Sequence, residues 1–314
     1  MIAGAAVAGW MSAISTTLMR TACLVTPFSG ESRNPQQGCA IAPLDSGFCR
    51  RTVAWAEESI TVAWMSKLFI FGMGYSASIL AKRLRGQGWQ VHGTGRGGDV
   101  DFTDHATVRA ALADATHILS SVPPDRASGA DPVLATYADA LRAAPARWIG
   151  YLSSTGVYGD AGGAWVDEGA IVGTGRRNAR TQADLDWQAL DPPLDSRVHV
   201  LRLPGIYGPG RSALDRVREG SAKRIDMPDQ VFSRVHVDDI AGGVIASFAG
   251  PPGVYNLSDD LPCSQNRVIE AACRLLAMPL PPMQTLEQAN LSAMALGFYA
   301  ENRRVANGKA KRLL

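Results

Sequence analysis

The sequence predicts an α/β protein with a Rossmann-type, doubly wound parallel sheet. A short apolar run, Leu68 to Phe71, stops at Gly72, and a helical pattern begins at Ser76. Strand and helix signals then alternate along the chain, a rhythm that implies right-handed βαβ crossovers. The body at 65–314 has about 250 residues, enough for one large α/β domain or for one with a small lobe.

The turn after the first strand has the spacing of a dinucleotide-binding motif, Gly72-x-Gly74-x-x-Ala77. Gly72 permits a tight strand-to-helix turn, and Gly74 lets a pyrophosphate approach the bare backbone. Ala77 keeps the helix close to the strand, so that the first N–H groups, around Tyr75 and Ser76, face the phosphates. The alternative is a plain glycine turn in another kind of α/β protein.

The later elements follow in order. Ala77, Leu80 and Leu84 share one face of the first helix, which ends at the glycines that follow. Because ligands of such sheets lie beyond the carboxyl ends of the strands, the turns after residues 71, 94, 121, 153 and 203 are where we expect a site. The expected elements are strands over 89–94, 116–121 and 148–153 and helices over 106–112 and 133–142.

The turn after the second strand, residues 93–98, is where a dinucleotide's adenosine ribose is read. An acidic residue there favours NAD, whereas an arginine accepts the 2′-phosphate of NADP. This turn contains no acid and offers Arg96 beside Thr94. Guanidinium geometry suits a phosphate, so we expect NADP, with NAD as the alternative cofactor.

Residues 1–64 differ from the body. They contain no lysine and hold three of the five cysteines, and only Arg20 is charged among the first thirty residues. A secretory signal would need a positive start before an unbroken apolar core, and a transit peptide would need several arginines. We expect a disordered extension, with the true start near Met65; a transit peptide is the alternative.

Composition argues against several classes of function. The net charge is +2 without a basic stripe, which argues against a nucleic-acid partner. No apolar run approaches the ~20 residues of a membrane helix, so no membrane partner is expected. Cys263 and Cys273 have neither metal nor redox spacing. We therefore expect no metal and two ordinary thiols in a reducing cytoplasm.

Further segments carry a family resemblance from residue 67 to about 304. The segments are the turn at 72–77, Asp101-Phe-Thr-Asp104, Ser153-Ser-Thr-Gly-Val-Tyr-Gly159, Leu201-Arg-Leu-Pro-Gly-Ile-Tyr-Gly-Pro209, Val235-His-Val-Asp-Asp-Ile240, Gly253-Val-Tyr-Asn-Leu257 and Asn302-Arg-Arg304. In these segments, taken together and in this order, the chain resembles the extended short-chain dehydrogenase/reductases, the NAD-dependent epimerase/dehydratase superfamily.

The resemblance implies positions for cofactor and substrate. Asp101 would lie near the adenine, and Asp238 and Asp239 would stand at a structural helix start. A smaller substrate lobe would be built from segments around 165–190, 210–230 and 255–314. The residues implied to line the cofactor are Ser120, Ser121, Val122 and Pro123, with Leu203, Pro204, Gly205 and Ile206 on the nicotinamide side.

The sequence departs from the family at two places. Phe71 stands where the family's first turn glycine would be. The family also has a Tyr and a Lys four residues apart, and the matching positions hold Arg176 and Arg180. Arginine stays charged and cannot serve as the proton donor, although two cations on one helix face suit an anion. Solvated surface arginines are the alternative.

Other residues near the expected site have assigned roles. Ser154 matches the family's catalytic Ser/Thr and would hydrogen-bond a substrate carbonyl or hydroxyl. The candidate catalytic residues are Ser154, Tyr158, Arg176 and Arg180. Tyr207 is the other phenol near that site, and aromatic packing is the alternative role of both tyrosines. His236 is expected to cap a helix rather than to act in catalysis.

The sequence thus predicts an NAD(P)-binding oxidoreductase or epimerase/dehydratase-like protein. Its partner would be a small polar substrate, neutral or anionic, handled with non-standard catalytic residues. The alternative is a non-catalytic NADP(H)-binding sensor or scaffold. The sequence does not distinguish a monomer from a homodimer.

Overall fold

The computed structural model describes residues 66–175 and 178–314. Six strands form one parallel sheet in the order β10-β6-β4-β3-β1-β2. The order reverses at β1, which pairs with β2 on one side and β3 on the other, so the switch point of the sheet lies at the glycine turn. The strands are β1 (Lys67–Phe71), β2 (Gln90–Gly93), β3 (His117–Ser120), β4 (Trp148–Ser154), β6 (Val198–Leu203) and β10 (Gly253–Asn256).

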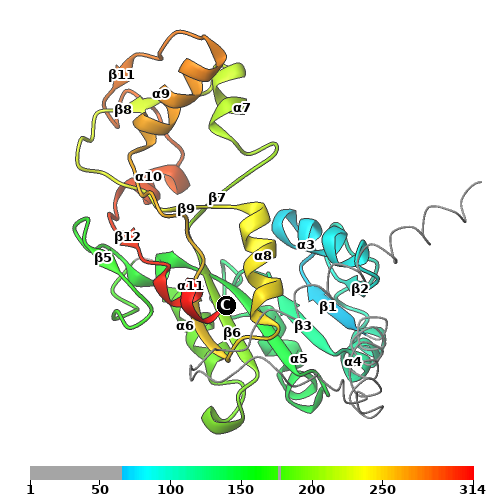
Figure 1. The fold of residues 1–314 in the computed structure, drawn as a ribbon. Helices are drawn as coiled ribbons and strands as arrows, with labels where there is room; N and C mark the ends of the chain where they lie inside the picture. Colours follow the sequence, from blue (N-terminus) through cyan, green and yellow to red (C-terminus); the bar gives the residue numbers. More distant parts are fainter. Residues whose placement is uncertain (1–65, 176–177) are drawn as a thin grey trace, which may run out of the picture. The chain divides into compact units, whose positions relative to one another are not determined.

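Helices cover both faces of this sheet (Figure 1). Helices α3 and α8 pack on one face, and α4, α5 and α6 pack on the other. This arrangement confirms the doubly wound α/β architecture. The helices are α3 (Tyr75–Arg85), α4 (His105–Asp114), α5 (Pro132–Ala143), α6 (Asn178–Gln188) and α8 (Val237–Ser247).

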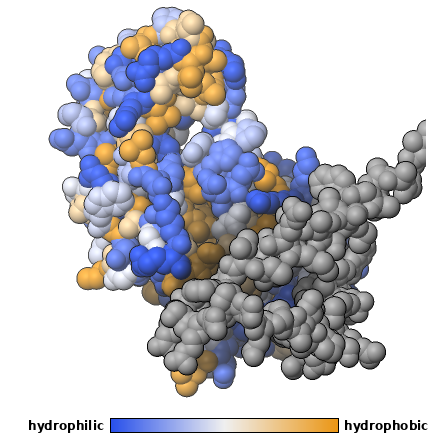
Figure 2. Space-filling model, in the orientation of Figure 1, coloured by the Kyte–Doolittle hydropathy of each residue, from blue (hydrophilic) through white to orange (hydrophobic). Residues whose placement is uncertain are grey.

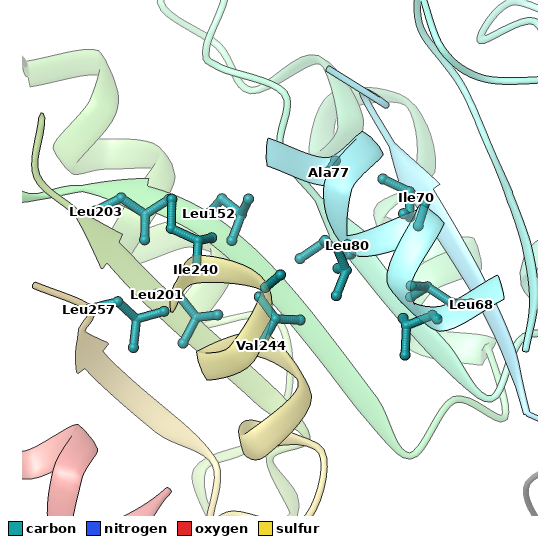
Figure 3. Packing of buried hydrophobic residues seen from close by; sticks show 14 of the residues in the cluster. Leu68, Ile70, Ala77, Leu80, Leu152, Leu201, Leu203, Ile240, Val244 and Leu257 are labelled. Atoms are coloured by element: carbon teal, nitrogen blue, oxygen red, sulfur yellow. The ribbon is translucent and has the colours of Figure 1, made fainter. Parts of the chain in front are cut away.

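The first face is sealed by aliphatic side chains. Figure 3 shows Leu80 of α3 and Val244 of α8 packed over sheet residues such as Ile70 and Leu201. All four side chains are buried. Because α3 carries the glycine turn at its start, this packing fixes the position of the turn against the sheet.

The second face is packed by a separate cluster of aromatic and aliphatic side chains. Tyr151 of β4 stacks on Trp187 of α6 with ring centroids 5.2 Å apart. Ala183 and Trp187 are buried in this cluster, so α6 packs on the sheet. This helix falls in the 165–190 segment that we expected in the smaller lobe.

The smaller lobe is formed mostly by segments that follow β6, and β5, which precedes β6 in the chain, joins them by pairing with β12. Helices α7 and α9 pack together around buried Val217, Ile269 and Cys273. Parallel strand pairs join the lobe's segments: β7 with β9, β8 with β11, and β5 with β12. The elements are β5 (Trp165–Val166), β7 (Gly205–Tyr207), α7 (Ala213–Arg218), β8 (Arg224–Ile225), β9 (Arg234–His236), α9 (Gln265–Leu276), β11 (Met283–Gln284), α10 (Ala293–Tyr299), β12 (Arg304–Val305) and α11 (Gly308–Leu313), with 3-10 turns η1 (Thr155–Tyr158) and η2 (Pro193–Asp195).

The expected extension at 1–64 and start at Met65 lie outside the described residues. Within the described ranges, no helix is long and apolar enough to cross a membrane. The same ranges contain no cluster of His, Cys, Asp and Glu that could hold a metal. Cys263 and Cys273 are free thiols.

Candidate functional site

The glycine turn is held by the two neighbouring strand ends. Gly72 has a φ of +80°, and its N–H donates to Thr94 Oγ1 at 3.1 Å. The Ser121 hydroxyl donates to the Gly72 carbonyl. A Cβ on Gly72 would lie 2.8 Å from Val122 Cγ2. Both the positive φ and this close packing require glycine. Gly72 is therefore needed for the conformation of the turn itself.

Gly74 has different surroundings. A Cβ built there would meet only the Gly72 carbonyl oxygen, at 3.9 Å. Gly74 is the N-cap of α3, which has no side-chain cap and no acidic residue in its first turn. The first N–H groups of α3, on Tyr75, Ser76 and Ala77, are therefore free of a capping side chain. This end of the helix offers space and hydrogen-bond donors to an anion.

The second turn packs directly on the first. The N–H of Met73 donates to the Thr94 carbonyl at 2.7 Å, and a Cβ on Gly95 would lie 3.1 Å from Met73 N. Thr94 is buried and supports the turn, whereas Arg96 is exposed. In the described part of the chain, Arg96 makes no hydrogen bond or ion pair. Its guanidinium is available to a ligand at this turn.

The other residues expected at the cofactor range from fully buried to exposed. Asp101 is exposed, and hydrogen bonds from the backbone N–H and hydroxyl of Thr103 lower the pKa of its carboxyl. Ser120 is fully buried, and its hydroxyl has no partner among the described residues. Val122 packs against the core, and Pro123 is exposed.

A cavity of about 1130 Å³ lies at the carboxyl ends of β4 and β6. The sheet body contributes Ser154 and Thr155, and the segment after β6 contributes Pro204, Gly205 and Ile206. Figure 2 shows this face hollowed beside the smaller lobe, with hydrophobic surface inside the hollow. Leu203 packs in the core and does not line the cavity.

Ser154 ends β4, and its Oγ accepts a hydrogen bond from Gly156 N at 3.1 Å as the N-cap of η1. Tyr207, the last residue of β7, lines the same cavity. Burial first, and then the carboxylates of Asp259 and Asp239, raise the pKa of Tyr207. The Tyr207 phenol is therefore protonated at neutral pH.

Tyr158 is placed differently. It is 2% exposed, its hydroxyl donates to Asn256 Oδ1 at 2.8 Å, and it accepts from Arg202 Nη1 at 3.0 Å. Burial raises the pKa of Tyr158. Tyr158 does not line the cavity, so this geometry gives it a structural role.

Tyr158 belongs to a buried polar network that joins β4, β6 and α6. Arg202 Nη2 donates to Asp184 Oδ1 at 2.8 Å, and Arg202 Nε donates to Asp184 Oδ2 at 3.1 Å. The Ser153 hydroxyl also donates to Asp184. The side chains of Arg202 and Asp184 are 3% and 0% exposed. The network fixes the strand ends from which Ser154 and Pro204 reach the cavity.

Only one of the two expected arginines falls within the described structure. Arg176 lies outside the described residues. Arg180 lies in the first turn of α6 and donates from Nη1 to the Tyr151 hydroxyl at 2.8 Å. Arg180 does not line the cavity. His236 caps α8, where its Nδ1 accepts from Asp238 N at 3.3 Å, so its expected capping role is confirmed.

Sequence reasoning missed most of the charged and phenolic residues that the lobe contributes to the cavity, and four of those missed interact electrostatically with one another. These four come from four elements or loops of the lobe, and no local motif links them. They are Arg216, Arg234, Asp259 and Tyr299.

No family model and no curated protein matches the sequence. Among solved structures, the chain matches a functionally unknown conserved protein from Silicibacter pomeroyi DSS. The identity is 43% and the TM-score 0.69, over 79% of this chain and 91% of that chain.

More distant structures share the fold. The human epimerase family protein SDR39U1 (isoform 2), solved with NADPH, is 16% identical, with a TM-score of 0.62 over 78% of this chain and 92% of that chain. The DesIV double mutant, a dTDP-glucose 4,6-dehydratase from Streptomyces venezuelae with NAD and DAU bound, is 15% identical. Its TM-score is 0.60 over 78% of this chain and 89% of that chain.

Proposed function

We propose that this chain, which belongs to the same family as the Silicibacter pomeroyi protein, binds NADP(H) and acts as an oxidoreductase or epimerase/dehydratase-like enzyme. The observation that carries the proposal is the open face of Gly74 at the uncapped start of α3. This turn lies at the sheet's switch point, where dinucleotides bind in doubly wound folds. The fold shared with NADPH- and NAD-bound structures supports the same cofactor class.

The preference for NADP rests on the second turn. Arg96 is exposed, makes no internal contact among the described residues, and stands where a 2′-phosphate would lie. The nearest acid after β2, Asp99, is engaged with Gly93 N at 2.9 Å. A free guanidinium without a free carboxylate beside it favours the phosphorylated cofactor.

Replacement of Arg96 by Asp should weaken NADPH binding by about 1.5–3 kcal/mol, roughly 10- to 150-fold, because a charge-assisted hydrogen bond is lost. NADH binding should change much less. Calorimetric titration of both cofactors measures the difference. Arg147→Asp is the matched control. Arg147 directly precedes β4, at the amino-terminal ends of the strands and away from the glycine turn, so this replacement should leave both affinities unchanged. Equal losses for NADPH and NADH in Arg96→Asp would refute the assignment.

Catalysis would use residues that line the cavity. The cofactor, when bound, would supply or accept a hydride. Ser154 would hydrogen-bond the substrate oxygen, and Tyr207 would donate the proton that this oxygen gains during carbonyl reduction. Tyr207 follows directly after Pro204–Ile206, the segment that the family resemblance assigns to the nicotinamide side, so a proton and a hydride would reach one substrate.

Removal of the Tyr207 hydroxyl should therefore slow the chemical step without weakening cofactor binding. Tyr207→Phe should lower kcat for NADPH oxidation against a carbonyl panel by about 10²–10⁴-fold, with the NADPH Kd unchanged. Tyr158→Phe is the comparison, since its loss should lower the melting temperature through the buried network. Full turnover in Tyr207→Phe would show that another group supplies the proton.

A non-catalytic NADP(H)-binding sensor or scaffold is the second candidate. It is favoured by the sequence, which holds no tyrosine between Tyr158 and Tyr207 and no lysine between Lys82 and Lys223. The same titrations separate the candidates. A chain that binds NADPH tightly yet oxidises none of the carbonyl panel, with Tyr207→Phe behaving identically, would support the scaffold.

A further inference from the structure

Two arginines of the smaller lobe reach the far end of the cavity without an ionic partner. Arg216 comes from α7 and Arg234 from β9, and both line the cavity with Tyr299 of α10. Among the described residues, neither guanidinium forms an ion pair. Arg216 is exposed at the rim of the cavity, although partial desolvation, followed by the positive charge of Arg234, lowers the pKa of its guanidinium. The two cations are therefore close enough to repel each other.

The hydrogen bonds of Arg234 go only to neutral groups. Its Nη1 donates to the Phe232 carbonyl at 2.9 Å and to the Cys263 carbonyl at 3.1 Å, and its Nη2 donates to Gln265 Oε1 at 3.2 Å. These contacts fix the guanidinium in place without neutralising it. By contrast, Arg303, in the same cavity, is paired with Glu301 at 3.0 Å.

One carboxyl lies near the arginine pair. Asp259 interacts electrostatically with Arg234, but burial raises the pKa of Asp259, and its Oδ1 is buried without a hydrogen-bond partner. The Nε2 of Gln265, which also lines the cavity, is likewise buried and unpartnered. The described lining holds five basic side chains against four carboxyls, and of these Glu301 is paired with Arg303. The end of the cavity therefore keeps an excess positive charge, together with unused donors and acceptors.

The walls around this charge are largely apolar. Side chains from four segments of the lobe contribute, and Ile269 of α9 joins them to the buried cluster between α7 and α9. The apolar lining includes Phe232, Leu261, Val268, Ile269, Leu291 and Phe298. A cationic end within an apolar cavity complements a molecule that has one anionic group on an apolar body.

We infer that Arg216 and Arg234 form an anion-binding subsite for an amphipathic substrate, held by a carboxylate or phosphate on an apolar body. The inference rests on the proposed function, because this molecule would be the substrate presented to Ser154 and Tyr207. It places the anion-binding arginines in the smaller lobe rather than at Arg176 and Arg180.

Binding of four probes to the full chain tests the inference. Octanoate and octyl phosphate present the two anionic groups on one apolar tail, octanol lacks the charge, and acetate lacks the tail. Calorimetry should show octanoate, octyl phosphate or both binding at least about tenfold more tightly than octanol and acetate, and more weakly at high salt. The tighter of the two anions identifies the preferred group. If neither octanoate nor octyl phosphate binds more tightly than octanol, the inference is contradicted.

Substitutions locate the site. Arg216→Met keeps the length of the side chain, breaks no hydrogen bond of the described structure, and should lower affinity for the preferred anion about tenfold or more. Arg234→Met should do the same, and its folding is checked by its melting temperature because Arg234 holds three neutral partners. Arg218→Met is the matched control, two residues along α7 and outside the cavity. Unchanged anion affinity in Arg216→Met would overturn the subsite.

NADPH titration of the same samples separates this inference from the proposed function. If NADPH binds and no anionic probe does, the subsite is wrong while cofactor binding stands. If the probes bind through Arg216 and NADPH does not bind, the subsite stands and the proposed cofactor is wrong.

Discussion

Gly74→Val should abolish dinucleotide binding while the protein remains folded. The structure leaves open space where this side chain would stand, and the backbone φ of −93° is compatible with valine. The added side chain would occupy the space that a pyrophosphate needs against the first turn of α3. We expect a loss of NADPH affinity of at least 100-fold, about 2.8 kcal/mol or more.

The measurement is calorimetric titration with NADPH, together with a thermal unfolding curve. Gly86→Ala at the other end of α3 is the control: its Cβ would make only ordinary contacts, at 3.4 and 3.5 Å, with backbone carbonyls. Gly72 cannot serve in this test, since a side chain there would strain the turn and strike Val122. Unchanged NADPH affinity in folded Gly74→Val would place the cofactor elsewhere.

Asp184→Asn should destabilise the fold by about 3–5 kcal/mol, since it leaves the buried Arg202 guanidinium without its counterion. In a body of this size the melting temperature should fall by roughly 6–20 °C. Chemical denaturation measures the free energy of unfolding. The double variant Asp184→Leu with Arg202→Met removes both charges and should lose less stability than the sum of the two single replacements.

An exposed ion pair provides the comparison. Arg109 Nη1 lies 2.8 Å from Asp139 Oδ2, and the two side chains are 45% and 69% exposed. Asp139→Asn should cost less than about 1 kcal/mol, because water already solvates both charges. A similar small loss in Asp184→Asn would mean that Arg202 finds another partner and that the network does not hold the strand ends.

The sheet body was predictable because its signals are local. The expected strand at 148–153 is observed as β4 (Trp148–Ser154), and the expected helix at 133–142 as α5 (Pro132–Ala143). In each case buried apolar positions, a cap or a glycine fix the element within a few residues of sequence. The position of α6 was not predictable in this way, because its place on the sheet depends on Trp187 stacking on Tyr151 of a separate strand.

The site was predictable only where the sequence carries a motif. The glycine turn is recognised by the spacing of its glycines. Ser154 ends β4 and Pro204 follows β6, and the carboxyl ends of these two neighbouring strands lie side by side at the cavity. Sequence reasoning could not distinguish Tyr158 from Tyr207, since burial and the partners Arg202 and Asn256 decide between them. Arg216 and Asp259 belong to separate segments, and only the folded lobe brings them to one cavity.

A crystal structure of the full chain with NADP⁺ tests the central claim most directly. We predict the pyrophosphate against the N–H groups of Tyr75 and Ser76, the 2′-phosphate within hydrogen-bond distance of Arg96, and the nicotinamide beside Pro204 at the cavity that Tyr207 lines. A dinucleotide bound away from the Gly74 turn, or a chain that takes up none at millimolar concentration, would contradict this account.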